Sequence, residues 1–236
     1  MNILGVCLIA EFSPHKQINE VNVRDIQAFL LQAFQRWGMP KQIRLDNGRP
    51  FRTSYQDVPS GLVLWLKALD IDVIFNKIHT PQQNGVVENH NGLTARWAEA
   101  HTKKSVEELQ NAINQVKHYQ LFSFPVAKLN GRTRISSFPE LEHNQRKYQP
   151  ESFDFSKVLA FIAQFNWVRI VDKTGCISLF HQKISIGRKW TKKYITISFN
   201  PNNQTFTAYD EKLEIIKNFQ LISLTKANVQ NLTVFQ

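Results

Sequence analysis

The spacing of hydrophobic positions changes along the first third of the chain. Residues 2–12 form an almost continuous run of apolar and β-forming side chains, which predicts a buried strand. Between residues 22 and 38 the apolar side chains recur every three to four positions, which predicts a helix that Asn22 caps and Gly38 ends. The same criteria predict a strand at 41–46, a helix at 60–71 with Ser60 as its cap, and a strand at 72–78. This order of strands and helices indicates an α/β domain with some parallel pairing.

The spacing of apolar positions changes twice more towards the C-terminus. Helical spacing continues from about residue 84 to 100 and again from 105 to 119, whereas residues 120–150 show no period and predict an extended connector. Beyond the connector the apolar positions alternate with a period of two, and turn-forming residues separate the runs. The strands predicted there are 158–171, 176–187, 192–200, 205–210 and 213–219. About five short strands in so few residues are typical of a small β-barrel of SH3-like type.

These patterns divide the sequence into three parts. Residues 1–120 form the α/β core, residues 121–153 form the connector, and residues 154–228 form the small β-barrel. Residues 1–150 and 151–236 each carry a net charge of +5, so the shorter C-terminal part is the more basic per residue.

Charge and cysteine content narrow the partners and the compartment. A formal net charge of +10 favours a polyanionic partner, and nucleic acid is the commonest one. Cys7 and Cys176 lie far apart without paired spacing, which argues against a disulfide framework or a zinc knuckle and favours a reducing compartment. The apolar run near the start is too short to cross a bilayer. We therefore expect a cytoplasmic protein with no membrane partner.

Two acidic residues stand where ligands collect in an α/β sheet. Asp46 follows the predicted strand 41–46 in the stretch "IRLDNGRPF", and Glu88 follows the loop after the next strand. Carboxylates at the carboxyl ends of strands suit a divalent cation that also binds phosphate oxygens. The same residues have simpler readings, because Asp46 with Asn47 fits an ordinary turn and Glu88 fits the first turn of a helix. His79 can equally be a polar loop residue.

Two sequence blocks favour the metal-site interpretation of Asp46 and Glu88. The block "FQRWGMPKQIRLDNGRPF", followed in order by "HTPQQNGVVENHNG", closely resembles the integrase catalytic core of bacterial insertion-sequence transposases. These are retroviral-integrase-like DDE enzymes, and the resemblance covers roughly residues 1–150. It implies an incomplete ribonuclease-H-like core followed by a small SH3-like all-β barrel. It also implies a role in DNA transposition, integration and recombination of a mobile element.

The resemblance assigns roles to individual residues. Asp46 matches the second catalytic aspartate of the family and Glu88 matches its catalytic glutamate, and both would be ligands of Mg²⁺ or Mn²⁺. The positions matched to the DNA-approaching turn and loops are Asn47, His79, Asn84 and Gly85. Intact relatives use the metal for strand cleavage and transfer.

The first catalytic aspartate of the family has no match. It belongs to the first strand of the sheet, but here no aspartate precedes Asp25, which lies on the polar face of the first predicted helix. We therefore expect a core that lacks its first strands, impaired metal binding, and no cleavage by this chain alone. A non-catalytic DNA-binding remnant of a transposase is the alternative, and a second copy or an intact transposase chain is a further possible partner.

Basic residues surround both the carboxylates and one aromatic residue of the barrel. Arg49 flanks Asp46, and Arg96 follows Glu88 on the same predicted helix. The stretch "GRKWTKK" places Arg188, Lys189, Lys192 and Lys193 around Trp190. Such residues contact DNA phosphates and stack on bases, although each charge can also be merely solvated and Trp190 can belong to the barrel core.

Overall fold

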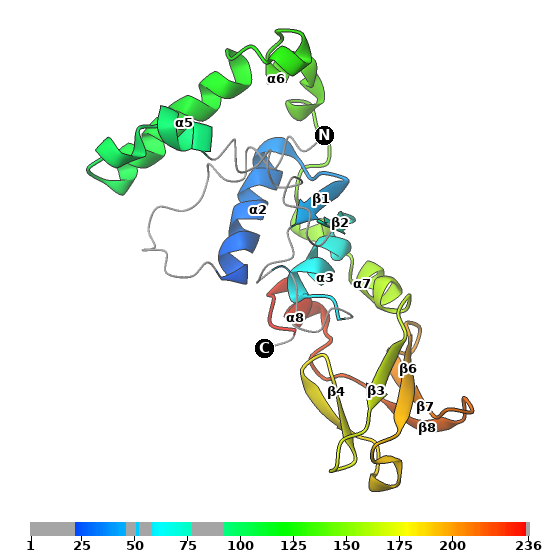
Figure 1. The fold of residues 1–236 in the computed structure, drawn as a ribbon. Helices are drawn as coiled ribbons and strands as arrows, with labels where there is room; N and C mark the ends of the chain where they lie inside the picture. The colour runs from blue at the N-terminus through cyan, green and yellow to red at the C-terminus, as the bar shows by residue number, and fades with distance from the viewer. Residues whose placement is uncertain (1–21, 46–50, 52–57, 77–91, 235–236) are drawn as a thin grey trace. The chain divides into compact units, whose positions relative to one another are not determined.

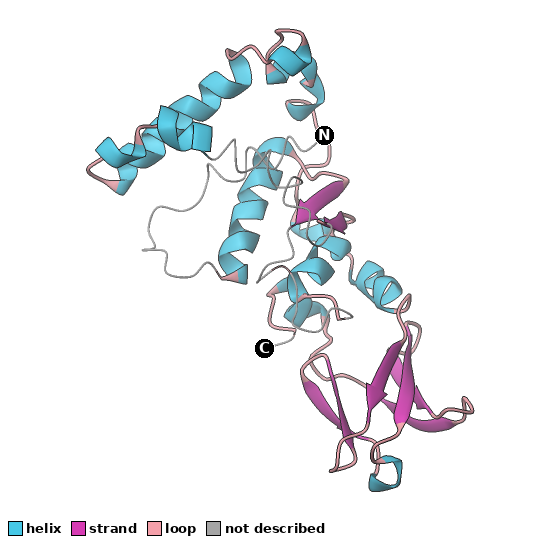
Figure 2. Cartoon of the chain, viewed as in Figure 1, coloured by secondary structure: helices cyan, strands magenta, loops and turns pink. Residues whose placement is uncertain are grey.

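The chain folds into two compact units, each built from two separate stretches of sequence. The computed structural model describes all residues except 1–21, 46–50, 52–57, 77–91 and 235–236 (Figure 1). Unit 1 comprises Met1–Gly48 and Ile71–Gln149, and unit 2 comprises Arg49–Asp70 and Pro150–Gln236. Helices and strands are mixed, as an α/β class predicts (Figure 2). The domain boundaries predicted at residues 120 and 153 stay predictions.

The first described helix, α2 (Val23–Trp37), begins and ends where its sequence predicts. The Asn22 side chain accepts hydrogen bonds from the backbone N–H groups of Arg24 and Asp25, at 2.9 and 3.0 Å. The Asp25 carboxylate in turn accepts from the Asn22 N–H at 3.2 Å, which completes a capping box. Gly38 ends the helix with φ 82°. The buried stripe consists of Ile26, Leu30, Ala33, Phe34 and Trp37.

Strands β1 (Gln42–Leu45) and β2 (Asp72–Phe75) of unit 1 pair in parallel. Backbone hydrogen bonds extend this ladder at both ends, from Asp72 N to Lys41 O at 2.9 Å and from Asn76 N to Leu45 O at 3.0 Å. The parallel pairing predicted from the alternation of strands and helices is therefore confirmed for these two strands. The strand predicted at residues 2–12 lies outside the described residues.

The described residues of unit 1 that follow β2 contain mainly helices. Residues 92–97 are helical, and α5 (Val106–Phe122) begins at Ser105, whose hydroxyl accepts a hydrogen bond from Glu108 N at 3.1 Å. The short helices of this unit are η3 (Ala100–Thr102), η4 (Ala127–Leu129), α6 (Arg134–Ser137) and η5 (Pro139–Leu141). The predicted connector thus contains several single turns of helix. It returns to the end of α2, because the Arg146 carbonyl accepts from Met39 N at 2.6 Å.

Helix α3 (Gly61–Ala68) is the buried centre of the helical part of unit 2. Ser60 caps it, as predicted, by accepting a hydrogen bond from Val63 N at 3.3 Å. The buried residues of α3 are Leu62, Val63, Leu64, Trp65, Leu66 and Ala68. It packs against α7 (Phe155–Ile162) and α8 (Lys226–Gln230), which come from the second, C-terminal stretch of this unit. The Ala68 carbonyl accepts from Asp154 N at 2.9 Å and so ties the two stretches together.

The single long strand predicted over residues 158–171 is wrong. Its first part is the helix α7, and only Trp167–Ile170 forms a strand, β3. The Asp154 carboxylate caps α7 by accepting from Ser156 N at 2.9 Å. The apolar run satisfies helical spacing as well as strand burial, because Val158, Leu159 and Ile162 share one buried face of the helix.

The sheet of unit 2 has the strand order β3-β6-β7-β8, with every neighbouring pair antiparallel. Its further strands are β6 (Tyr194–Asn200), β7 (Thr205–Tyr209) and β8 (Ile215–Phe219), and a separate hairpin joins β4 (Cys176–Leu179) to β5 (Gln182–Ser185). Two further short helices are η6 (Pro150–Ser152) and η7 (Arg188–Trp190). The turns predicted at 172–175 and 200–203 join strands as expected. Trp167, Phe180 and Phe206 pack together beneath the sheet, with ring centroids 5.4 to 6.0 Å apart.

Candidate nucleic-acid interface

Most of the site residues predicted for the core stay predictions. Asp46, Asn47, Arg49, His79, Asn84, Gly85 and Glu88 lie outside the described residues. Arg96 is described, and its exposed side chain donates from Nε to Gly92 O at 3.3 Å on its own helix. The four basic residues predicted around Trp190 are all described and belong to unit 2.

We call residues 188–193, between β5 and β6, the basic loop. Its four cationic side chains, Arg188, Lys189, Lys192 and Lys193, are exposed. Two backbone hydrogen bonds fix the loop to the end of β3, from Lys192 N to Val171 O at 2.9 Å and from Val171 N to Lys193 O at 3.0 Å. Within the described part of the chain, no ion pair to a carboxylate is found for these four side chains. The loop therefore presents positive charge that stays available to a polyanion.

Two of these cations lie over the ring of Trp190. Lys189 Nζ and Lys193 Nζ are each 5.2 Å from the centroid of the indole ring, a distance at which the ring attracts an ammonium group. Trp190 is half-buried, and its Nε1 is covered without a hydrogen-bond acceptor among the described residues. The sequence left two roles open for Trp190, stacking on bases or a place in the barrel core. The half-buried ring with two lysines over it is not an open stacking surface, and it suits a third role, positioning of the lysines.

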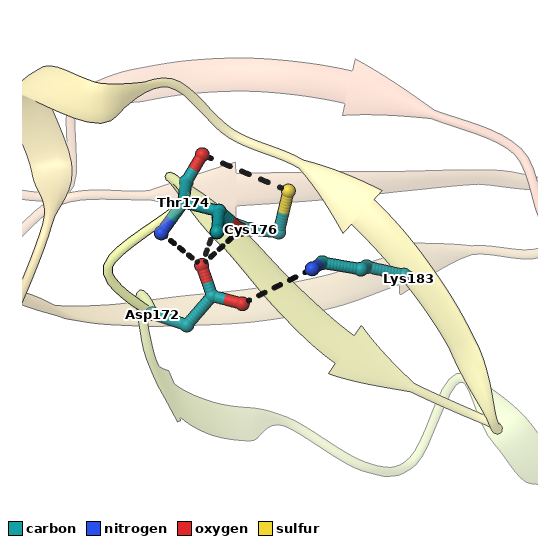
Figure 3. Close-up of polar contacts among 4 residues, drawn as sticks. All are labelled: Asp172, Thr174, Cys176 and Lys183. Atoms are coloured by element: carbon teal, nitrogen blue, oxygen red, sulfur yellow. Dashed lines mark hydrogen bonds and ion pairs between the residues drawn. The ribbon is translucent and has the colours of Figure 1, made fainter.

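A tight turn at residues 172–175 supports the basic loop. The Asp172 Oδ1 atom accepts hydrogen bonds from Thr174 N and Thr174 Oγ1, both at 2.7 Å, and from Cys176 N at 3.0 Å (Figure 3). Lys183 Nζ reaches the other carboxylate oxygen from β5 at 3.5 Å. The hydrogen bond from the Thr174 side chain, with the backbone donors and Lys183, lowers the pKa of Asp172 to about 2. Sequence reasoning had identified a turn at 172–175 but not this carboxylate network.

The network makes the stability of unit 2 depend on pH. Because the folded pKa of Asp172 lies below its unfolded value of about 3.9, the stabilisation is complete above about pH 5. It is lost as the pH falls from there through about 3.9 towards about 2. We expect Asp172→Asn to lower the melting temperature at pH 7 and to flatten the acid dependence in that window. Thermal melts at steps of pH measure both effects. Glu211→Gln, which removes an exposed acidic charge elsewhere in unit 2, is the control, and an unchanged acid limb in Asp172→Asn would contradict the assignment.

Gly175 joins this turn to the basic loop and leaves no room for a side chain. Its φ is 81°, and its carbonyl accepts hydrogen bonds from Ile186 N at 2.8 Å and Gly187 N at 2.9 Å. A Cβ atom there would lie 2.7 Å from Arg188 N and 2.8 Å from the Gly187 carbonyl carbon. Both contacts are with backbone, so the loop itself would have to shift.

We expect Gly175→Ala to destabilise unit 2 by roughly 2–4 kcal/mol, since the left-handed backbone and the steric clash both contribute. Gly131→Ala is the matched control, because Gly131 has φ 76° but nothing within 4 Å of a Cβ atom, so only the backbone cost of about 1–2 kcal/mol applies. Chemical denaturation of the full chain measures both variants. Equal losses would show that the Gly187–Arg188 backbone accommodates the methyl group.

The sequence matches no family model. Across the described ranges, the helices are all too short or too polar to cross a lipid bilayer. Among the predicted sites, the basic loop and the hydrogen bonds that hold it are the part that the described residues define most fully.

Proposed function

We propose that this chain is a DNA-binding protein of the transposase–integrase class, in which the basic loop holds the phosphate backbone. The observation that carries the proposal is the gathering of four exposed cations within residues 188–193, fixed by hydrogen bonds to β3. Arginine and lysine side chains that neutralise phosphates supply most of the sequence-independent affinity of proteins for DNA. A loop whose backbone is already fixed loses little conformational freedom when it binds.

The proposed fold is a ribonuclease-H-like core with a following SH3-like barrel. The parallel pair β1–β2 is compatible with such a core, and β1 ends at Leu45, directly before Asp46 in the sequence. Asp46 and Glu88 would then hold Mg²⁺ or Mn²⁺, which activates water and stabilises the departing oxygen in phosphodiester chemistry. Proposed DNA contacts of the core are Asn47, Arg49, His79, Asn84, Gly85 and Arg96. The four-stranded sheet with the β4–β5 hairpin is compatible with the barrel.

DNA binding without strand cleavage is the second candidate function. The specific observation in its favour is that residues 1–24 contain no aspartate and only two glutamates, Glu11 and Glu20. The sequence therefore matches two of the three carboxylates of the family's site. Both candidates require DNA binding through the basic loop, and they differ only in the chemistry that follows.

The test of the shared requirement is the salt dependence of DNA binding. The full chain and its Lys189→Ala/Lys192→Ala/Lys193→Ala variant are titrated against a labelled duplex at salt concentrations between about 50 and 200 mM. We expect the variant to lose about 2–3 units of the slope of log K against log salt, since each phosphate contact contributes about 0.9.

A variant of equal charge is the control for this titration. Lys128→Ala/Lys212→Ala/Lys226→Ala removes three exposed lysines outside the basic loop, and we expect its slope to stay near that of the unaltered chain. Equal slopes in the two triple variants would show that only net charge matters. Absence of binding at the lowest salt would overturn the proposed function.

A further inference from the structure

The solvent-facing side of the four-stranded sheet forms a continuous surface. Val168, Thr196, Tyr209 and Ile215 lie opposite one another and form one row across all four strands. Ile170 and Tyr194 form a second row beside it, and Ser198, Thr207 and Asn218 form a third. Directly opposed residues of antiparallel strands point to the same side of the sheet. We call this surface the outer face.

The outer face contains no charged residue at any outward position of these strands. Its members are Val168, Ile170, Tyr194, Thr196, Ser198, Asn200, Thr205, Thr207, Tyr209, Ile215 and Asn218. The apolar members are well exposed, at 58% for Val168, 54% for Ile170, 61% for Tyr194 and 65% for Ile215. A solvated sheet face usually carries lysine and glutamate, and contiguous exposed apolar surface marks an interaction site. In a chain of net charge +10 this uncharged surface is therefore unusual.

The basic loop borders the outer face along one edge. Lys193 is followed directly by Tyr194, which lies opposite Ile170 at the end of the β3–β6 ladder. The hydrogen bonds between the loop and Val171 continue the same ladder. Cations at an edge beside an uncharged surface with an exposed aromatic ring complement a ligand that is anionic on one side and flat and apolar on the other.

We propose that the outer face binds the bases of single-stranded DNA, with Tyr194 as a stacking platform and the basic loop on the adjoining phosphates. Unpaired nucleotides offer π faces for stacking and base edges for the hydroxyl and amide groups of Thr196, Ser198 and Asn218. A duplex keeps those π faces inside its own stack, so the outer face adds nothing to duplex affinity. The inference rests on the proposed DNA-binding function and assigns it a second ligand and a second surface.

The experiment compares a labelled oligothymidine with a duplex of equal length, using the full chain and fluorescence anisotropy. We expect Tyr194→Ala to weaken binding of the single strand by roughly 5- to 150-fold, the loss that removal of one base–aromatic stack gives. Duplex affinity and the salt slope for both ligands are expected to stay unchanged, because no charge is removed. Tyr194→Phe, which keeps the ring, is expected to retain single-strand affinity.

Further variants separate the outer face from a general effect of exposed apolar groups. Ile170→Ser removes a second member of the outer face and is expected to weaken single-strand binding, whereas Ile222→Ala, 88% exposed and outside the strands, is expected to have no effect. Unchanged single-strand affinity in Tyr194→Ala, or equal losses for both ligands, would overturn the inference. Sedimentation that shows Tyr194→Ala dissociating a dimer would overturn it in favour of a second copy of the chain.

Different results would overturn DNA binding by the basic loop and single-strand binding by the outer face. Duplex binding with the expected salt slope, but no binding of the oligothymidine, would overturn the single-strand site and leave the proposed function standing. Absence of binding to either ligand would overturn both.

Discussion

Incubated with DNA and Mg²⁺ or Mn²⁺, the purified chain is expected to cleave no phosphodiester bond. The resemblance to integrase-core transposases implies a site of three carboxylates, and this sequence matches only Asp46 and Glu88. Loss of one group of a catalytic set commonly lowers the rate by about 10³-fold or more, which would put cleavage below detection. End-labelled DNA resolved on a denaturing gel, over a range of metal concentrations, measures the result.

Three variants provide results that could contradict this expectation. Cleavage that disappears in Asp46→Asn and in Glu88→Gln, but persists when the exposed Glu140 is changed to Gln, would show that another acidic residue completes the site. That outcome would establish a metal-dependent DNA-cleaving activity of this chain. Intact DNA in every reaction, together with salt-dependent binding, is the pattern expected of the second candidate function.

Trp167→Ala is expected to destabilise unit 2 by about 3–5 kcal/mol. Trp167 is 1% exposed, and its ring lies at the centre of an aromatic cluster, 5.4 Å from the centroid of Phe180 and 5.9 Å from that of Phe206. Truncation would leave a cavity that the neighbouring rings, themselves held by the sheet and the β4–β5 hairpin, cannot fill without moving strands. Denaturant unfolding of the full chain gives the free-energy change.

The neighbouring residue supplies the control. Val168 is adjacent in sequence but points to the outer face and is 58% exposed, so Val168→Ala is expected to cost less than about 1 kcal/mol. Similar losses in the two variants would mean that the cluster beneath the sheet collapses around the missing ring. A Trp167→Ala protein with an unchanged free energy of unfolding would contradict the description of this core.

Local chemistry predicted helices α2, α3 and α5, because a cap depends on a few neighbouring residues. Asn22 and Ser60 cap α2 and α3 as their sequence positions predicted. The parallel pairing of β1 with β2 was also predicted, since the order of elements restricts the topology. That α3 packs against α7 and α8, however, depends on contacts between residues far apart in sequence, which no local pattern contains.

The error at α7 has a definite physical cause. Short apolar runs suit a buried strand and a buried helix equally, so hydrophobic periodicity alone could not decide between them. The discriminating feature was Asp154, an N-cap residue placed just before the run. Packing against α3 then favours the helix, and the strand is confined to Trp167–Ile170.

The sequence predicted the charged residues of the candidate site but not the contacts that hold the basic loop in place. Basic residues around a tryptophan are visible in the sequence, and the structure places two lysines over the Trp190 ring. The ion pair between Lys183 and Asp172 and the contact of Gly175 with the Gly187–Arg188 backbone join segments that are separated in sequence, so they required the fold. The uncharged outer face likewise emerges only from the register of four strands, although β6 and β7 on their own show alternation.

The division of unit 2 into two stretches of sequence has a consequence for synthesis on the ribosome. Helix α3 is translated about 90 residues before α7 and about 160 residues before α8, the helices that pack against it. At about 5–20 residues per second, its apolar side chains wait roughly 4–17 s for α7 and roughly 8–32 s for α8, long enough for chaperones or other nascent chains to bind. A ribosome that pauses within Ile71–Gln149 prolongs that exposure, so the yield of folded protein should depend on codon usage in a segment that belongs to the other unit.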